Sequence, residues 1–205
     1  LSNVYPDLLN RPFDPNNAYS VPYFWGNIGI IYNTQNVDVA DLEAEGWDVL
    51  KNPKYADRIY IYDSARDAFM VAQKALGYSV NTTDEAEIEA AFEWLKDMNS
   101  TTRPIYIDET IIDNMITEQK DLAVDFSGDA AYVMSQNPNM SFYVPEEGTN
   151  VWMDSMIIPA NAKEVDLAHK WINFMLENEV ALKNTIYVGY TSPVKSAFET
   201  VTGAG

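Results

Sequence analysis

The sequence contains no cysteine and a single histidine, His169, in 205 residues. The missing cysteines exclude disulfides, thiolate metal sites and cysteine nucleophiles, and one histidine cannot build a zinc site that needs several. A Ser-His-Asp catalytic triad is also disfavoured, and His169, beside Lys170 on an expected helix, is predicted to be exposed. We therefore expect no metal and no other cofactor.

Basic residues are few, since 13 lysines and arginines stand against 31 aspartates and glutamates and the formal charge is −18. This charge repels phosphate backbones and anionic lipid, and it attracts cations. No apolar run reaches the roughly 18 residues needed to span a bilayer, and the opening LSNVYPDLLN lacks the pattern of a targeting segment. We expect no nucleic-acid partner, and either a soluble chain or a mature chain whose targeting segment lies outside it.

The hydrophobic residues that are present, 47% of the chain, are sufficient for one large core or two small ones. Short apolar strands alternate with amphipathic helices, which predicts an α/β fold with a layered, mainly parallel sheet flanked by helices. The strands are expected at 21–33, 59–62, 105–107, 122–126, 142–144 and 156–158. The helices are expected at 41–50, after the turn at 63–64, through 88–98, at 109–119, from near 129, through 167–175 and at 179–186.

The two ends of the chain show weaker patterns. Pro6, Pro12, Pro15 and the Asn16-Asn17 pair interrupt the first 20 residues, which we interpret as an extended arm or surface loop. The last residues, TVTGAG, end without a capping pattern, so we expect the chain to be cut at this point.

Aromatic residues are numerous, with five tryptophans and thirteen tyrosines, and several lie close to acids. A protonated amine has a pKa of about 10.4, so at neutral pH it needs an anionic partner or an aromatic face once it leaves water. Aromatic rings beside carboxylates therefore predict a site for an organic cation. The candidates are Tyr62-Asp63 and Trp152-Met153-Asp154, with Trp25 and Tyr190 in addition.

Each of these residues also has a purely structural interpretation. Ser64 and Asp67 have nearly the spacing of a helix capping box, and Asp63 resembles a turn-forming acid at the end of a strand. Trp152 alone would fit a core. In an extended segment, however, its ring lies on the same face as the Asp154 carboxylate, which favours a binding role.

One ordered set of stretches runs almost from end to end of the chain: RPFDPNN (11–17), VPYFWG (21–26), DSARD (63–67), GY (77–78), NTTD (81–84), WMDS (152–155), IPANAK (158–163) and GY (189–190). This set resembles the spermidine/putrescine-binding proteins of bacterial polyamine ABC importers. The resemblance implies a periplasmic-binding-protein-like fold, in which two α/β lobes joined by crossing strands close on a ligand.

The resemblance also implies roles for individual residues. Trp152 would stack on the methylene groups of a polyamine, and Asp154 would hold an inner amine. The acids of the turn at 63–67 would hold a terminal amine, and Tyr190 would line the cleft.

Two departures from the family pattern affect the terminal amine. Where the family commonly has Asp-Asp-Ala-Arg-Glu, this chain has DSARD, so that Ser64 replaces one carboxylate and Asp67 is shorter by one methylene. Where the family tends to have Trp-Asn-Gly, this chain has Phe126-Ser-Gly followed by Asp129. We expect Asp63 or Asp129 to compensate, and Phe126, Trp25, Trp152 and Tyr190 to exclude water from the carbon chain.

The family pattern further implies that about the first third of a typical member and a C-terminal segment lie outside this sequence. Trp171, Phe174 and Met175 would then lack their usual sheet, and we expect them to pack on a rearranged surface or on a neighbour, which includes self-association. The implied organisation is an arm and inter-lobe crossing (1–25), the second lobe (26–151), a crossing with the return segment of the first lobe (152–190), and a truncated crossing back (191–205).

These observations predict a solute-binding component of an ABC importer, not an enzyme, that captures a polyamine and delivers it to a membrane permease. It would be periplasmic or extracellular and held at the membrane by a lipid anchor or a permease outside this sequence. One alternative is a binding protein of the same fold for another small solute, such as an amino acid or a metal chelate. A second is a hydrolase that uses Asp63 and Asp67 as a carboxylate pair. A third is a purely structural or permease-docking module.

Overall fold

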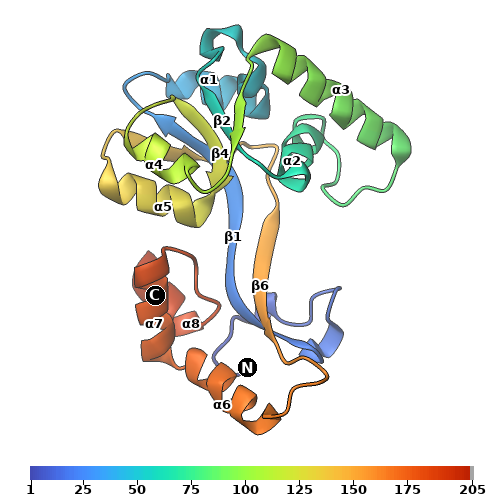
Figure 1. The fold of residues 1–205 in the computed structure, drawn as a ribbon, viewed down its shortest axis with the longest axis vertical. Coiled ribbons are helices and arrows are strands. Elements are labelled where there is room, and N and C mark those ends of the chain that lie inside the picture. The colour runs from blue at the N-terminus through green and yellow to red at the C-terminus, as the bar shows by residue number, and fades with distance from the viewer. Residues whose placement is uncertain (204–205) are drawn as a thin grey trace. The chain divides into compact units, whose positions relative to one another are not determined.

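The computed structural model describes residues 1–203, which form two compact units. Unit 1 contains residues 1–26 and the described residues from 151 onward, and unit 2 contains residues 27–150. The long strand β1 (Ser20–Asn33) contributes its first half to unit 1 and its second half to unit 2 (Figure 1). Each unit has a hydrophobic core of its own.

Unit 2 is built on a sheet of strands in the order β3-β2-β4-β1-β5. β2 is parallel to β3 and β4, and β1 is antiparallel to β4 and β5, so that β1 runs against the other four. This confirms the expected mainly parallel sheet. The strands other than β1 are β2 (Ile59–Tyr62), β3 (Ile105–Ile107), β4 (Leu122–Phe126) and β5 (Met140–Tyr143).

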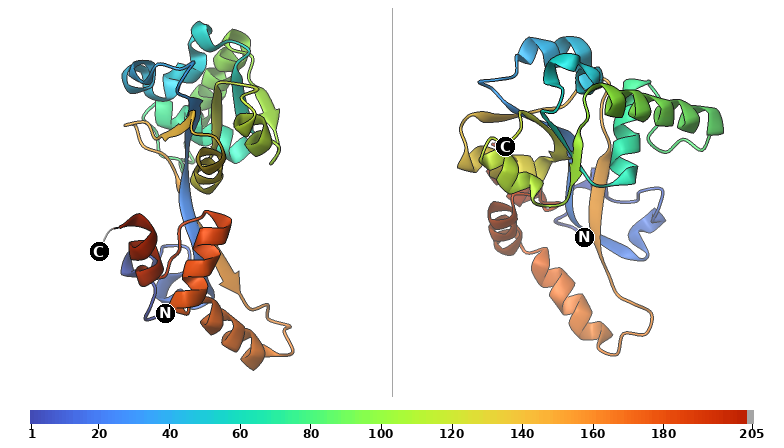
Figure 2. Two further views of the ribbon diagram at one scale, coloured as in Figure 1. Left: turned by 90° about the vertical axis from the view of Figure 1, so that its left-hand side faces the viewer. Right: turned by 45° about the horizontal axis from the view of Figure 1, so that its top comes forward.

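Helices cover both faces of this sheet, because successive strand side chains point to opposite sides. Ile30, Ile59 and Leu122 pack in one core with α1, α2 and α3, whereas Ile31 and Ala123 pack in a second core with α4 and α5. Figures 1 and 2 show these two helical layers on either side of the strands. The helices are α1 (Val39–Glu45), α2 (Ala65–Ala75), α3 (Glu85–Thr101), α4 (Ile111–Ile116) and α5 (Ser127–Gln136).

Unit 1 combines the N-terminal segment with everything described after residue 150. Strand β6 (Val151–Ile157) pairs with β1, and isolated bridges join Val4 to Val194 and Trp25 to Thr191. Three helices complete the unit: α6 (Val165–Met175), α7 (Asn178–Val188) and α8 (Lys195–Thr202). Its core contains Val4, Leu8, Leu176, Ala181, Val194 and Ala197.

The N-terminal segment is more ordered than an extended arm. Two short 3-10 helices, Pro6–Leu8 and Pro15–Asn17, follow the proline positions. Between them, the buried Asp14 carboxylate accepts hydrogen bonds from the backbone N–H groups of residues 18–20 and from the Ser20 hydroxyl. The Ser20 hydroxyl oxygen lies 2.6 Å from a carboxylate oxygen of Asp14. This bond, together with the backbone bonds, lowers the pKa of Asp14. The segment is therefore a folded loop with short helical turns, which fits the surface-loop interpretation better than the extended one.

Three other boundaries differ from the sequence-based expectation. The helix expected at 41–50 ends at Glu45 and continues as the 3-10 helix Gly46–Lys51, because Gly46 has a positive φ of 54°. β6 begins at Val151 instead of 156. Residues Lys195–Thr202 form α8, which was not predicted, and Gly203 in the left-handed conformation ends it with a bond from its N–H to the Glu199 carbonyl. The last two residues of the TVTGAG segment lie outside the described residues.

The backbone of β1 at Gly29 lies close to β5, and a substitution at Gly29 tests this close contact. An added Cβ at Gly29 would lie 2.7 Å from the Tyr143 carbonyl oxygen and would overlap the Phe142 ring. We expect Gly29→Ala to lower the free energy of unfolding by about 1–3 kcal/mol, measured by urea denaturation. Gly77→Ala is the control, because its Cβ meets open space and only the φ of 76° is strained. A Gly29→Ala protein no less stable than Gly77→Ala would contradict the close approach.

Candidate functional site

In unit 1, the candidate site residues lie on β6 and just after α7. Alternation along β6 places Trp152 and Asp154 on one face and Met153 on the other. Trp152 packs edge-on against Tyr190, with ring centroids 5.1 Å apart, and Tyr190 also contacts Phe24 at 6.2 Å. The Asp154 side chain is exposed. The structure therefore brings two expected aromatic residues together beside the face that carries Asp154.

Tyr190 reaches this position because α7 ends at Gly189. Gly189 has a φ of 88°, and its N–H bonds to the Thr185 carbonyl. A left-handed residue closes the helix and turns the chain away, so that residue 190 leaves the helix axis. The helix expected at 179–186 is thus present and extends two residues further, to Val188.

Trp25 belongs to a different cluster of unit 1. Its indole N–H donates to the Ser192 carbonyl at 3.3 Å, and its ring lies 6.1 Å from Phe198. With Met153 it lines a pocket of about 470 Å³. Since Met153 and Trp152 point to opposite faces of β6, the structure does not bring Trp25 together with the Trp152–Tyr190 pair.

In unit 2, the turn after β2 carries Asp63, Ser64 and Asp67. The backbone N–H of Asp63 donates to the Ile107 carbonyl at 2.8 Å, and its side chain is exposed. The Ser64 hydroxyl accepts the Asp67 N–H at 3.4 Å and caps α2. The capping interpretation of Ser64 is confirmed on this side. Asp67 is half-buried in the first turn of α2.

Phe126 and Asp129 stand at the end of β4 and in the first turn of α5. Phe126 packs edge-on against Tyr62, with ring centroids 5.1 Å apart. The Tyr62 hydroxyl donates to a carboxylate oxygen of Glu109 at 3.1 Å. Burial, then this bond and the nearby charge of Glu109, raise the pKa of Tyr62.

Asp125 is the most unusual residue at this end of the sheet. It is 1% exposed, and one carboxylate oxygen accepts the N–H of Phe126 at 2.9 Å. The other oxygen has no hydrogen-bond partner among the described residues. Burial, reinforced by the charge of Asp129 and more weakly by Asp67 and Glu109, raises the pKa of Asp125 to about 8.

The acids Asp67, Glu109, Asp125 and Asp129 form what we call the unit 2 acidic cluster. Within residues 1–203, no lysine or arginine forms an ion pair with Asp67, Glu109 or Asp125. In the same range, no three His, Cys, Asp or Glu side chains are arranged to hold a metal ion. Asp67, Glu109 and Asp125 therefore leave negative charge at this end of the sheet that no basic side chain of the described residues neutralises through an ion pair.

Sequence reasoning missed two members of this cluster, Glu109 and Asp125. A signal for Asp125 was present, because LAVDF is an apolar strand with one charged residue near its carboxyl end. In α/β sheets, ligands bind at that end of parallel strands. Glu109 gave no such signal, since it lies in a polar connection and enters the cluster only through the spatial order of β3, β2 and β4.

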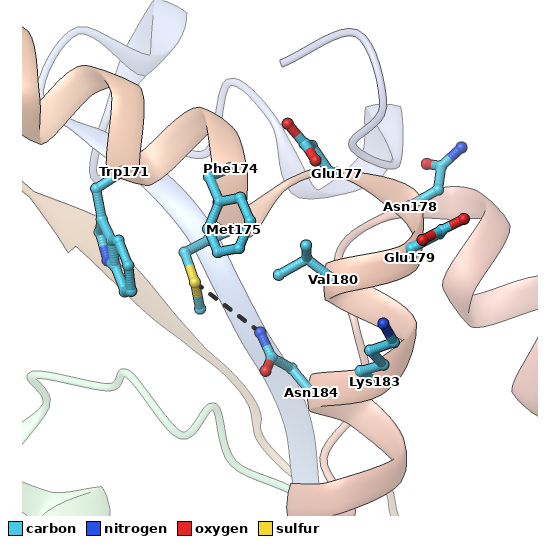
Figure 3. A pocket seen from close by; sticks show the side chains of 9 residues that line it. All are labelled: Trp171, Phe174, Met175, Glu177, Asn178, Glu179, Val180, Lys183 and Asn184. Atoms are coloured by element: carbon cyan, nitrogen blue, oxygen red, sulfur yellow. Dashed lines mark hydrogen bonds between the residues drawn. The ribbon is translucent and has the colours of Figure 1, made fainter.

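A separate apolar pocket lies between α6 and α7 in unit 1 (Figure 3). The Trp171 and Phe174 side chains are 60% and 43% exposed, and their ring centroids lie 5.7 Å apart. Met175 completes the apolar wall, and Lys183 and Asn184 face it from α7. None of the expected ligand-binding residues lines this pocket. His169 is exposed on α6, as predicted.

A family model described as bacterial extracellular solute-binding protein matches residues 2–199. The chain belongs to this family. Within the described residues, none of the helices combines the length and apolar character that crossing a bilayer requires.

Relatives within the solute-binding family carry more specific names. The chain is 40% identical over 192 residues to the spermidine/putrescine-binding periplasmic protein of Escherichia coli K12, a match covering 94% of this chain and 54% of that protein. The protein of the same name from Salmonella typhimurium is 39% identical over 191 residues, covering 93% and 54%. The chain thus spans about half the length of the curated relatives it matches.

A crystal structure shows the same likeness in three dimensions. The spermidine/putrescine ABC transporter substrate-binding protein PotD from Streptococcus pneumoniae has a TM-score of 0.84 and 38% identity, over 97% of this chain and 60% of that one. Together with the mixed α/β architecture, this confirms the expected periplasmic-binding-protein fold and the family resemblance.

The raised pKa of Asp125 predicts how stability depends on pH. Between the unfolded pKa of about 3.9 and the folded pKa of about 8, the folded state keeps a proton that the unfolded chain has released. Stability should therefore fall as pH rises from 5 to 7, by up to about 1.4 kcal/mol per pH unit from this one group. Urea unfolding of the full-length natural protein at pH 5, 6 and 7 measures this slope.

Asp125→Asn should flatten the slope, because the amide does not titrate. Asp113→Asn is the control, since Asp113 is exposed on α4 and the substitution makes the same change in charge. Equal slopes in the wild type and in Asp125→Asn would show that Asp125 does not carry the proton.

Proposed function

We propose that the protein containing this chain is a solute-binding component of an ABC importer that captures a linear polyamine, spermidine or putrescine, and is not an enzyme. The observation that carries the proposal is the unit 2 acidic cluster, three of whose carboxylates have no basic partner among the described residues. The names of the relatives from Escherichia coli and Salmonella typhimurium support the polyamine as the cation.

A polyamine offers two kinds of surface, and the chain has residues for each. Its ammonium groups require carboxylates, and we assign Asp154 in unit 1 and Asp67 in unit 2 to this role, with Asp63 or Asp129 compensating for Ser64. A charge-assisted hydrogen bond contributes about 1.5–3 kcal/mol.

The methylene groups of the ligand require apolar faces that exclude water. The Trp152–Tyr190 pair in unit 1 supplies one such surface, and Phe126 beside Tyr62 supplies another in unit 2. A cation near an aromatic face gains about 2 kcal/mol when desolvated. Trp25 is placed in another cluster of unit 1, so its role in ligand binding has the least support.

The other expected solutes and activities have less support. A metal chelate or an amino acid would use the same fold, but the acidic cluster offers negative charge without a paired cation for a carboxylate group of the ligand. A hydrolase based on Asp63 and Asp67 is disfavoured because both residues lie on one turn, with Asp63 exposed and Asp67 in a helix terminus.

Location and partners follow from the relatives. Their names place them in the periplasm, and we propose a periplasmic or extracellular location, with delivery of the ligand to a membrane permease. The division of the structure near residues 26 and 150 supports the proposed lobe boundaries. Self-association through Trp171, Phe174 and Met175 stays a prediction, supported by the exposure of the Trp171 and Phe174 rings.

The assignment of Asp154 is tested by titration calorimetry of the full-length natural protein with putrescine, spermidine and arginine. Binding of the polyamines with micromolar or better affinity is expected. Asp154→Asn should weaken that binding by about 2 kcal/mol or more, because an ammonium group loses its charged partner.

Asp166→Asn is the matched control, because Asp166 is exposed on α6 and the charge change is identical. It should leave the affinity unchanged. An Asp154→Asn protein that binds as tightly as this control would remove Asp154 from the site, and a wild type that binds arginine but no polyamine would overturn the proposed ligand.

A further inference from the structure

We propose that Asp125 is an additional ligand-binding carboxylate, which is protonated while the site is empty and releases its proton when a ligand ammonium group enters the unit 2 acidic cluster. This inference rests on the proposed function and adds proton release to it. Asp125 is not among the residues implied by the family resemblance.

The place of Asp125 in the fold puts a carboxylate at the ligand-binding end of the sheet. It is the second-to-last residue of β4, and β4 lies beside the parallel strand β2. The side chain is 1% exposed, and one of its two oxygens has no hydrogen-bond partner among the described residues. A buried oxygen of this kind costs free energy unless it is protonated or meets a donor.

The groups that act on Asp125 come from every neighbouring element at this end of the sheet. The charges of Asp129 on α5, Asp67 on α2 and Glu109 before α4 raise its pKa, and the Tyr62 hydroxyl donates to Glu109. On β1, the residue opposite Asp125 is Gly29, which has no side chain. The side-chain charges that raise the pKa of Asp125 are therefore all negative, and the N–H of Phe126 offsets them only in part, so an incoming cation would favour the ionised form further.

The proton balance of this step is simple. In the empty site the carboxyl O–H is intact, and when an ammonium group enters, the O–H bond breaks and the proton passes to solvent. The ligand amine keeps its own proton, because its pKa of about 10.4 lies well above neutral pH. Since the free carboxyl titrates near pH 8, affinity should rise with pH below 8 and become constant above it.

Calorimetry of the full-length natural protein with putrescine tests this directly. Titrations at pH 7 in two buffers with different ionisation enthalpies give the number of protons released per ligand, which should approach one. Between pH 6 and pH 7.5 the affinity should rise about five- to tenfold per pH unit, because one proton leaves per putrescine bound. No proton release by the wild type would overturn the inference, even though putrescine binds.

Asp125→Asn should bind putrescine with neither proton release nor the rise in affinity. The control Asp113→Asn, at an exposed position of α4, should retain both. Proton release that persists in Asp125→Asn would assign the proton to another group. If the wild type binds no polyamine at all, the proposed function fails instead, so the two failures are distinguishable.

Discussion

Uncompensated negative charge at one end of the unit 2 sheet is the constraint on which the candidate site depends. Carboxylates that have left bulk water must be protonated, paired with a basic side chain or neutralised by a ligand. Asp125 has no basic partner in the described part of the chain, and its neighbours are acids. A cation that binds from solution would therefore stabilise these acids, because it supplies the positive charge that the folded chain lacks there.

The sheet topology explains why these acids meet. β2, β3 and β4 are mutually parallel neighbours, so their carboxyl ends lie at the same edge. Asp67 follows β2, Glu109 follows β3, and Asp129 follows β4, while Asp125 lies within the end of β4 itself. Helices α2 and α5 begin at this edge, and their N-terminal dipoles partly offset the negative charge of the acids in their first turns.

The spacing of apolar residues and the residue types at turns were enough to predict most of the fold. β2, β3 and β4 have the boundaries expected from their apolar runs, and Ser64 caps α2 as its spacing suggested. The sequence could not show the helix α8, because its amphipathic pattern is short and its partners lie in α7 and the N-terminal segment. Nor could it show that Trp25 faces away from Trp152, since that depends on the pairing of β1 with β6.

The 14 residues of β1 run through both units without a turn, and their side chains alternate between faces along the whole length. Deleting or inserting one residue inside this strand would invert every side chain on one side of the change relative to the other. In either unit 1 or unit 2, the β1 side chains that face away from the core would then point into it. A change of one residue in the length of β1 is thus more disruptive than the same change in a connecting loop, where no alternation of faces has to be kept.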